Sequence, residues 1–493
     1  MKKYSPIQSQ KRGIVRASKQ QYRKVRHRSN PLVVIICLFL LLGCFSCGDT
    51  KKTPTLFSAL DPAQTGVAFS NDLSYTEEYN PYTYRNFYNG GGVALGDINN
   101  DGLLDIYFSG NLVDNKLYLN KGNLEFEDIT EQAGVACPNV WSAGVNMMDI
   151  NGDGLLDIYV CKAGKPEGEN RNNELFINQG DLTFVEQSAE YGLDITGLSI
   201  QTAFFDYDRD GDLDCYLLNN SLRSVGGFDM KEGLRDIYDP EGNKLLENQD
   251  GKFVDVTQQA GIYSSSIGYG LGITLADFNW DGWPDVFLSN DFFEKDYLYL
   301  NNQDGTFTET VDRSFTSLSM GSMGADASDL DNALLPEIFV TEMLPRKGAR
   351  RKTKTVYENW DKYQLAVAKD YHHQFARNVL HKNLDGEQFV ELGRLAGVES
   401  SEWSWSALIQ DFDNDGLRDI FISNGIRSDL LDKDYLNYMA NDTRIRAMID
   451  EDKEVLKTLI DAMPSGAIPN AIFKNQGELR FSYESTNWGL DAP

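Results

Sequence analysis

One short acidic pattern recurs along the chain and constrains the fold more than any other feature. Its intact copies have Asp or Asn at positions 1, 3 and 5, Gly at position 6 and Asp at position 9, and each leads directly into a short apolar run. These copies span residues 97–105, 149–157, 206–214, 277–285 and 411–419. Recurrence of this kind predicts similar structural units that pack against one another.

A sixth copy, residues 329–337, keeps the frame of the pattern but has lost two of its landmarks. Ala333 replaces the acid at position 5, and Leu334 replaces the glycine at position 6. The segment still leads into the apolar run 338–340, so we expect the same strand to follow. The chain therefore contains a repeat unit here, although its acidic loop is degraded.

A second element follows each acidic loop and predicts a β-hairpin. It consists of a short apolar run, an Asn, a Gly a few residues later and then a Phe. The Asn residues are Asn120, Asn178, Asn248, Asn301, Asn383 and Asn475. Asn and Gly between two apolar runs are typical of tight hairpin turns.

One unit is therefore a strand, an acidic loop, a strand, a connection, a strand, an Asn-Gly turn and a strand. Four short strands in about 50 residues are typical of a β-propeller blade. Radial packing covers the faces of such sheets and leaves only short edges. We expect an all-β propeller of four-stranded blades over residues 65–493. Seven blades are favoured over six, with C-terminal strands pairing near residues 65–69 to close the ring.

The uneven spacing of the acidic loops predicts insertions between blades. Residues 221–243 are rich in Gly and charge, and residues 345–378 begin with a basic run at 346–352 and continue as a helix-like stretch. Residues 427–468 have apolar side chains at helical spacing. We expect helices that cap one face of the propeller; the alternative is a lid that binds a partner.

The acidic loops have the chemistry of a calcium site. Ca²⁺ takes roughly six to eight oxygen ligands at about 2.3–2.6 Å. Positions 1, 3 and 5 aim alternate side chains at one point, the glycine permits a sharp turn, position 7 offers a carbonyl oxygen and position 9 a carboxylate. Several carboxylates in nine residues repel one another unless a cation neutralises them. Mg²⁺ is less favoured because it prefers to keep several water ligands.

The candidate metal ligands are positions 1, 3, 5, 7 and 9 of the five intact loops. They are Asp97, Asn99, Asp101, Leu103, Asp105, Asp149, Asn151, Asp153, Leu155, Asp157, Asp206, Asp208, Asp210, Asp212, Asp214, Asp277, Asn279, Asp281, Trp283, Asp285, Asp411, Asp413, Asp415, Leu417 and Asp419.

These loops resemble the FG-GAP/VCBS repeats, the calcium-loop blades also found in the propellers of integrin α-subunits. The segment 89–92, the run Leu95 to Asp97 and the Asn-Gly hairpins resemble bacterial proteins of the cartilage-acidic-protein type in particular. The resemblance covers residues 65–493 and implies one Ca²⁺ in each intact loop, about five ions. The degraded copy departs from the pattern, so a sixth ion is not expected. Larger relatives carry further repeats, so ring closure and truncation at Pro493 both remain open.

The N-terminal 47 residues are expected to be an export signal. Residues 1–43 contain ten Lys or Arg and no acid, and they end in the apolar run 32–42, which is too short to span a membrane. Leu41 to Cys44 resembles a bacterial lipobox, in which the cysteine is acylated. Cys44 is the first candidate for lipidation and Cys47 the alternative, whereas an ordinary cleaved signal would carry no lipid. Residues 48–64 would form a tether at the outer membrane or cell surface.

Charge and cysteine content exclude several classes of protein. The net charge of −28 argues against a nucleic-acid partner, because phosphate backbones require basic surfaces. The six cysteines form neither a disulfide framework nor a zinc pattern. Beyond the signal, Cys137, Cys161 and Cys215 are expected to be small buried residues.

No catalytic motif accompanies the repeats. The chain has four histidines and lacks a Gly-x-Ser-x-Gly, a Walker loop or a His-Glu-x-x-His sequence. We therefore expect a calcium-binding envelope lipoprotein that binds an unknown protein or glycan as an adhesion or scaffold module, with no catalytic residues. One alternative is a polysaccharide-degrading enzyme, with His372 and His373 as the best candidates. Another is a structural subunit of an envelope complex, docked through the basic run 346–352 or through Trp403 and Trp405.

Overall fold

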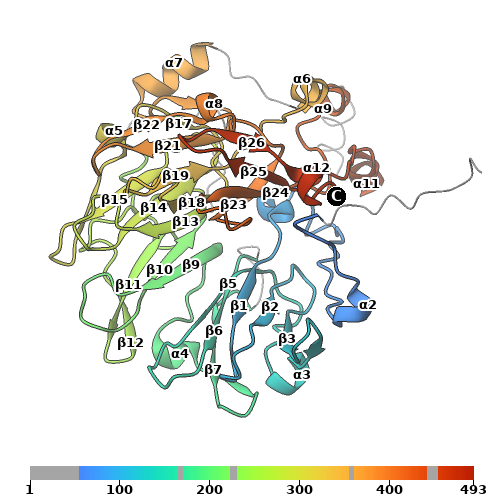
Figure 1. The fold of residues 1–493 in the computed structure, drawn as a ribbon, viewed down its shortest axis with the longest axis vertical. Helices are drawn as coiled ribbons and strands as arrows, with labels where there is room; N and C mark the ends of the chain where they lie inside the picture. Colours follow the sequence, from blue (N-terminus) through green and yellow to red (C-terminus); the bar gives the residue numbers. More distant parts are fainter. Residues whose placement is uncertain are drawn as a thin grey trace, which may run out of the picture. The chain divides into compact units, whose positions relative to one another are not determined.

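The repeats form six antiparallel sheets of four strands each, and these are the blades of a β-propeller. Figure 1 shows the blades following one another around a ring in chain order. The innermost strands of successive blades lie side by side, β1 next to β5, β5 next to β9, β9 next to β13, β13 next to β18 and β18 next to β23. The predicted all-β propeller is therefore confirmed.

Each blade takes its strands from one continuous stretch of chain. Blade 1 comprises β1 (Val93–Gly96), β2 (Asp105–Phe108), β3 (Lys116–Asn120) and β4 (Phe126–Asp128). Blade 2 comprises β5 (Ser142–Met148), β6 (Asp157–Lys162), β7 (Glu174–Asn178) and β8 (Phe184–Glu186). Blade 3 comprises β9 (Ser199–Phe205), β10 (Asp214–Asn219), β11 (Lys244–Gln249) and β12 (Lys252–Asp255). Blade 4 comprises β13 (Gly270–Ala276), β14 (Asp285–Asn290), β15 (Tyr297–Asn301) and β16 (Phe307–Glu309). Blade 5 comprises β18 (Ala325–Ser328), β19 (Glu337–Val340), β21 (Val379–Asn383) and β22 (Phe389–Glu391). Blade 6 comprises β23 (Ser404–Gln410), β24 (Asp419–Asn424), β25 (Ala471–Asn475) and β26 (Phe481–Tyr483).

The computed structural model describes residues 55–164, 170–221, 230–231, 233–354, 360–440 and 453–492. The expected signal, Cys44, Cys47 and the first part of the tether lie outside these residues. The chain from Thr55 onward is a compact unit of its own.

The described residues contain six blades, the smaller of the two expected numbers. The ends of this unit meet through backbone and ring contacts instead of sharing a blade. The Phe57 amide donates to the Trp488 carbonyl at 2.8 Å, and their rings are 6.4 Å apart. Phe69 stacks on Phe108 of blade 1 with ring centroids 4.9 Å apart. The N-terminal segment therefore contacts blade 1 and the C-terminal end of blade 6 without adding a strand.

Apolar side chains fill the spaces between blades. Tyr159 and Leu175 of blade 2, for example, belong to one buried cluster with Leu217 and Phe253 of blade 3. Full burial of such a side chain stabilises the fold by about 1.5–3 kcal/mol. The three described cysteines are buried and unpaired, as expected; they are Cys137, Cys161 and Cys215.

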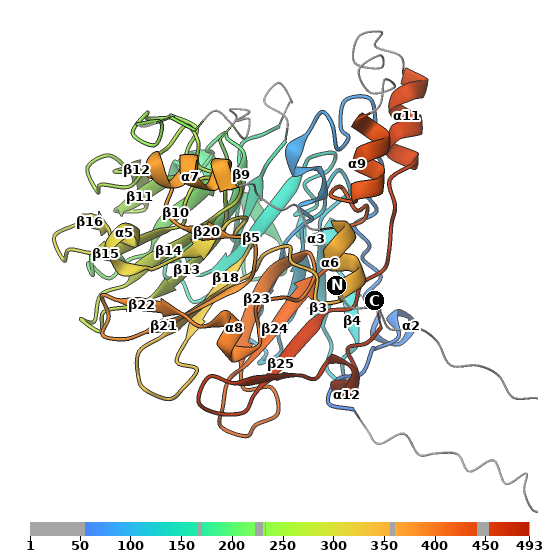
Figure 2. The same cartoon turned by 90° about the horizontal axis from the view of Figure 1, so that it is seen from above.

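Two of the insertions contain the expected helices. The insertion in blade 5 holds α6 (Gly348–Lys354) and α7 (Trp360–Ala368), and the insertion in blade 6 holds α9 (Lys433–Ala440) and α11 (Lys453–Asp461). Figure 2 shows α6, α9 and α11 close together at one side of the propeller. The basic run partly serves this packing, because Arg350 on α6 bonds to Glu402 at 2.9 Å and to Asp429 at 3.3 Å.

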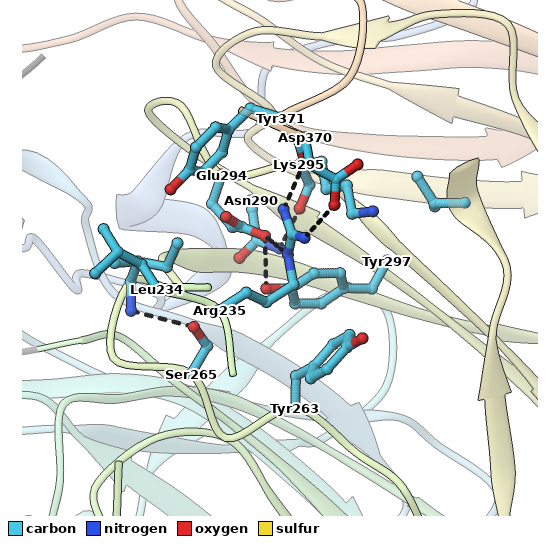
Figure 3. A network of polar contacts seen from close by, with 12 residues as sticks. Leu234, Arg235, Tyr263, Ser265, Asn290, Glu294, Lys295, Tyr297, Asp370 and Tyr371 are labelled. Atoms are coloured by element: carbon cyan, nitrogen blue, oxygen red, sulfur yellow. Dashed lines mark hydrogen bonds and ion pairs between the residues drawn. The ribbon is translucent and has the colours of Figure 1, made fainter. Parts of the chain in front are cut away.

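A partly buried ionic network joins two insertions to blade 4 (Figure 3). Arg235 of the insertion in blade 3 lies 2.5 Å from Glu294 Oε1 and 3.3 Å from Asp370 Oδ2 of the insertion in blade 5. Tyr297 at the start of β15 also donates to Glu294, at 2.9 Å. Burial raises the pKa of Glu294, and the Arg235 guanidinium opposes that rise. The network therefore joins three blades on the side where the insertions lie.

Candidate metal centres

Each acidic loop joins the first two strands of its blade, and its backbone wraps around the carboxylate at position 1. In blade 2 the Asp149 carboxylate accepts the amides of Asp153 at 3.0 Å and Gly154 at 2.8 Å. Blade 4 repeats this arrangement, with Asp277 accepting the amides of Asp281 and Gly282. Local side-chain-to-backbone bonds of this kind are typical of Asp in turns. The nine residues therefore form a closed loop with a defined shape.

Two positions of the loop adopt left-handed backbone conformation. The glycines at position 6 have φ between 87° and 101°, as the sequence predicts, and Leu334 of the degraded copy has φ 80°. Position 4 is also left-handed in all six copies, which the sequence analysis missed. Its residues are Asn100, Gly152, Arg209, Trp280, Asn332 and Asn414. The signal was available, because four of the six are Asn or Gly, which tolerate this region.

The acid at position 9 ties the loop to the hairpin between the third and fourth strands. Asp157 is buried and accepts the amides of Ile150 at 3.2 Å and Asn178 at 2.8 Å. Burial raises the pKa of Asp157 to about 6, and the corresponding pKa values of Asp214 and Asp285 to about 7. The other acids of each loop raise these values further, so any nearby cation would favour the charged form.

In four pairs of neighbouring blades the side chain of the hairpin Asn also donates a hydrogen bond to the acidic loop of the preceding blade, and we call this contact the clasp. The Asn amide group donates to the carbonyl of position 2 in that loop at 2.8–2.9 Å. The pairs are Asn178 with Ile98, Asn301 with Tyr207, Asn383 with Phe278 and Asn475 with Leu330. An ordered acidic loop is therefore part of the contact between blades.

Carboxylates of the acidic loops lie close together in blades 3, 5 and 6. Carboxylate oxygens of Asp206, Asp208 and Asp210 all lie within 4.8 Å of one another, and the same holds for Asp411, Asp413 and Asp419. The degraded loop brings Asp329, Asp331 and Glu337 together in the same way. Concentrated carboxylates in a turn form a donor set that suits Ca²⁺, so the residues present fit this ion.

Three of the intact loops have Asn at position 3, and its side chain points into the loop. In blade 1 the Asn99 Oδ1 accepts the Asp101 amide at 3.2 Å, while its Nδ2 donates to Asp101 Oδ2 at 3.0 Å. Blades 2 and 4 show the same pair of contacts. These contacts, with the bond from the position-5 amide to the position-1 carboxylate, bring positions 1, 3 and 5 of these loops together. Coordination by any of these side chains, or by the position-7 carbonyls, stays a prediction.

In blades 3, 5 and 6 the residue just before the hairpin Asn lies beside the acidic loop, and its identity differs between blades. In blades 1 to 6 it is Leu119, Ile177, Glu247, Leu300, Lys382 and Lys474. Lys474 Nζ lies 2.8 Å from Asp415 Oδ2 and also contacts Asp413 Oδ2. This ammonium group holds the pKa of Asp415 below its usual value.

Blade 5 also places a lysine beside its acidic loop, whereas blade 3 places a glutamate there. Lys382 Nζ contacts Asp331 Oδ2 in the degraded loop. In blade 3 the side chain is Glu247, whose Oε2 accepts the Tyr207 hydroxyl at 3.1 Å. Burial and neighbouring carboxylates raise the pKa values of Asp208 and Asp212. These neighbours were not among the predicted site residues, although the Lys-Asn pair at two of the six hairpins is visible in the sequence.

The histidines proposed for an enzyme, His372 and His373, lie in the insertion of blade 5 with ring centroids 5.7 Å apart. His381 is buried in β21 against Phe315, with ring centroids 4.6 Å apart, and burial lowers its pKa to about 3. His373 Nδ1 lies 2.7 Å from the Tyr363 hydroxyl in the insertion. None of the three groups of possible metal ligands found in the described chain includes a histidine.

Within the part of the chain that the structure describes, no helix has the length and apolar character needed to cross a membrane.

Comparisons with known proteins agree with the repeat pattern. The FG-GAP-like repeat family matches residues 97–160 and 277–340. Human Cartilage acidic protein 1 is 28% identical over 242 residues, which are 48% of this chain and 33% of the human protein. The Xenopus tropicalis protein of the same name is 28% identical over 208 residues, or 42% and 29% of the two chains. The matches thus span about a third of these relatives, and the resemblance to FG-GAP repeats is confirmed.

Two solved structures are distantly similar. A lectin of Agrocybe aegerita that recognises non-reducing terminal N-acetylglucosamine has a TM-score of 0.42 and 14% identity, over 81% of this chain and 83% of the lectin. The V. cholerae biofilm matrix protein Bap1 has a TM-score of 0.31 and 13% identity, over 61% of this chain and 39% of that chain. Neither likeness carries an argument about function.

Proposed function

We propose that this chain is a calcium-stabilised binding module of the cell envelope. The observation that carries the proposal is the clasp between neighbouring blades: a hairpin Asn of one blade bonds to the acidic loop of the blade before it. An ion that orders the loop would therefore also secure the contact between blades. Calcium would act as a structural element of the propeller.

Calcium would be held by the side chains that the loops bring together. In the five intact loops, which would hold about five ions, these are positions 1, 3 and 5, with the position-9 carboxylate and the position-7 carbonyl as further ligands. When bound, the ion would neutralise the carboxylates and join the two halves of the loop. The amides that bond to positions 1 and 9 already fix these carboxylates in place, which lowers the entropic cost of binding.

A binding function, rather than catalysis, agrees with the rigid frame and the absence of catalytic motifs in the sequence. The insertions lie at the ends of the strands opposite the acidic loops, because antiparallel strands return the chain to that edge. We propose that the face carrying these insertions binds a protein or glycan. Binding of the chain to an array of glycans and to envelope proteins, with and without calcium, would identify the class of ligand.

The same proposal includes export and a lipid anchor at the outer membrane or cell surface. Cys44 is the proposed acylation site and Cys47 the alternative. Expression with a labelled fatty acid should label the wild-type chain and C47S but not C44S. Label in C44S and none in C47S would move the anchor to the alternative site, and an unlabelled wild-type chain would contradict the anchor.

Thermal melting tests the calcium claim on the chain lacking its first 47 residues, which retains the whole compact unit from Thr55. Each ion present at about a hundred times its dissociation constant stabilises the fold by about 2.7 kcal/mol. Several ions together should raise the melting temperature by about 10 °C over a sample in EDTA. Mg²⁺ at the same concentration should restore little of this difference. Equal melting temperatures in calcium and EDTA would contradict the proposal.

A further inference from the structure

We infer that lysine side chains replace the metal ion in two blades, so that calcium binds to the loops of blades 1 to 4 and not to the loop of blade 6. The inference rests on the proposed function, because calcium binding by the other loops is itself a proposal. It changes the expected number of ions from about five to four. It also makes the residue before the hairpin Asn the determinant of metal binding.

The position of Lys474 carries the inference. The backbone amide of the next residue, Asn475, donates to Asp419 Oδ1 at 2.9 Å, so the lysine is held at the edge of the acidic loop. The ammonium group lies 2.8 Å from Asp415 and contacts Asp413 as well. These are the acids at positions 3 and 5, which a calcium ion in this loop would need. A bound ion would have to displace the lysine from both carboxylates.

The three side chains concerned are partly exposed, and Asp413 is the least exposed of them. The exposed fraction is 25% for Lys474, 19% for Asp413 and 34% for Asp415. The partly buried pair of Lys474 and Asp413 is screened less than charges on the open surface. An ion entering the loop would therefore face both competition for its ligands and repulsion from a fixed ammonium group.

Blade 5 provides an independent copy of the arrangement. Its loop lacks the acid at position 5 and the glycine at position 6, yet it brings three carboxylates together. Lys382 occupies the same hairpin position as Lys474 and contacts Asp331. The lysine thus accompanies a loop that has already lost part of the calcium pattern. Blade 6 has the same lysine while its acidic pattern is intact.

The other four blades offer no cation at this position. Blades 1, 2 and 4 have Leu119, Ile177 and Leu300 there, and blade 3 has Glu247. Buried carboxylate oxygens without a hydrogen-bond partner among the described residues occur in the loop of blade 3, at Asp206 and Asp212, and also at Asp413 of blade 6, whose other oxygen contacts Lys474. Of these four loops, that of blade 3 has the greatest excess of negative charge.

Calcium stoichiometry tests the inference, measured by equilibrium dialysis and metal analysis on the chain lacking its first 47 residues. The wild-type chain should bind four ions, and K474L should bind a fifth because its ligands become free. K474Q, which keeps the length and polarity of the side chain but not its charge, should also bind a fifth ion. K121L, on the exposed hairpin of blade 1, is the matched control and should stay at four.

The outcomes separate the inference from the proposed function. Five ions in the wild-type chain, or four in both folded variants at position 474, would overturn the inference and leave calcium binding intact. No bound ion in the wild-type chain would overturn the proposed function. Circular dichroism in calcium establishes that each variant is folded before its ions are counted. K382L should stay at four, because its loop lacks Asp and Gly at positions 5 and 6.

Discussion

Blade 3 and blade 6 contain the same pattern of ligands in their acidic loops but place opposite charges beside it. Both loops have Asp at positions 1, 3, 5 and 9 and Gly at position 6. Glu247 lies next to the loop in blade 3, and Lys474 lies next to it in blade 6. The comparison teaches that the nine residues define the shape of the loop, whereas a residue of the following hairpin sets its charge balance.

The carboxyl groups respond to this difference. In blade 3 burial raises the pKa of Asp208, and the neighbouring acids, Glu247 among them, raise it further. In blade 6 the lysine lowers the pKa of Asp415. Without a metal ion, folding therefore brings like charges together in one blade and opposite charges in the other.

Removal of calcium should loosen blades 1 to 4 and leave blades 5 and 6 ordered. Each ion that is removed takes away about 2.7 kcal/mol of stability, and only blades 1 to 4, which have no lysine beside the acidic loop, would lose an ion. Hydrogen exchange followed by mass spectrometry, in calcium and in EDTA, should show faster exchange in β10 and β11 than in β24 and β25. Equal acceleration in all six blades would remove the distinction between the two groups.

Exchanging the charge in blade 3 should make it resemble blade 6. In E247K the new ammonium group would take the place of the ion, so calcium stoichiometry should fall by one. The calcium-dependent rise in stability should shrink by about 2–4 kcal/mol, measured by urea unfolding with and without EDTA. E247Q is the control and should keep its ion. Undiminished stoichiometry in folded E247K would show that this position does not control binding.

Loss of a hairpin clasp should affect calcium only where the clasped loop binds an ion. N301A leaves the Tyr207 carbonyl of the blade 3 loop without this donor, and N475A does the same to Leu330 of the blade 5 loop. Each change should destabilise the fold by about 1–3 kcal/mol. Calorimetric titration should show weaker calcium binding for N301A and wild-type affinity for N475A. Equal weakening in both variants would contradict the assignment of blade 5 as metal-free.

The smallest effect is expected from the backbone of the degraded loop. Leu334 has φ 80°, in a region where a side chain costs about 1–2 kcal/mol. L334G should therefore stabilise the chain by up to about 1 kcal/mol, after the greater flexibility of glycine in the unfolded state is allowed for. G416A, at the same position of the intact loop in blade 6, should destabilise it. Urea unfolding measures both, and a destabilised L334G would show that the leucine side chain packs favourably.

Local chemistry explains what could be predicted from the sequence. Each acidic loop and each Asn-Gly hairpin is formed by residues close together in the chain, so their repeats indicated four-stranded blades and the predicted ligand sets. The contact of Lys474 with Asp413 joins residues 61 positions apart, across a helical insertion. No local pattern shows such a contact, and the acids at positions 1, 3, 5 and 9 are the same in blades 3 and 6.

The number of blades also could not be predicted from local sequence patterns. Six loops indicated at least six blades, but the fate of the N-terminal segment depended on contacts with the other end of the chain. The backbone bond from Phe57 to Trp488 could not be inferred from either segment alone. The left-handed residue at position 4 is a different case, because its preference for Asn and Gly was present in the repeats.

A crystal structure of the chain grown with a lanthanide in place of calcium tests the central claim most directly. Anomalous scattering locates each ion independently of the protein atoms. The account predicts peaks in the loops of blades 1, 2, 3 and 4, with Lys474 on Asp413 and Asp415 and no peak in blade 6. A peak of equal height in the loop 411–419, with the lysine displaced, would contradict it.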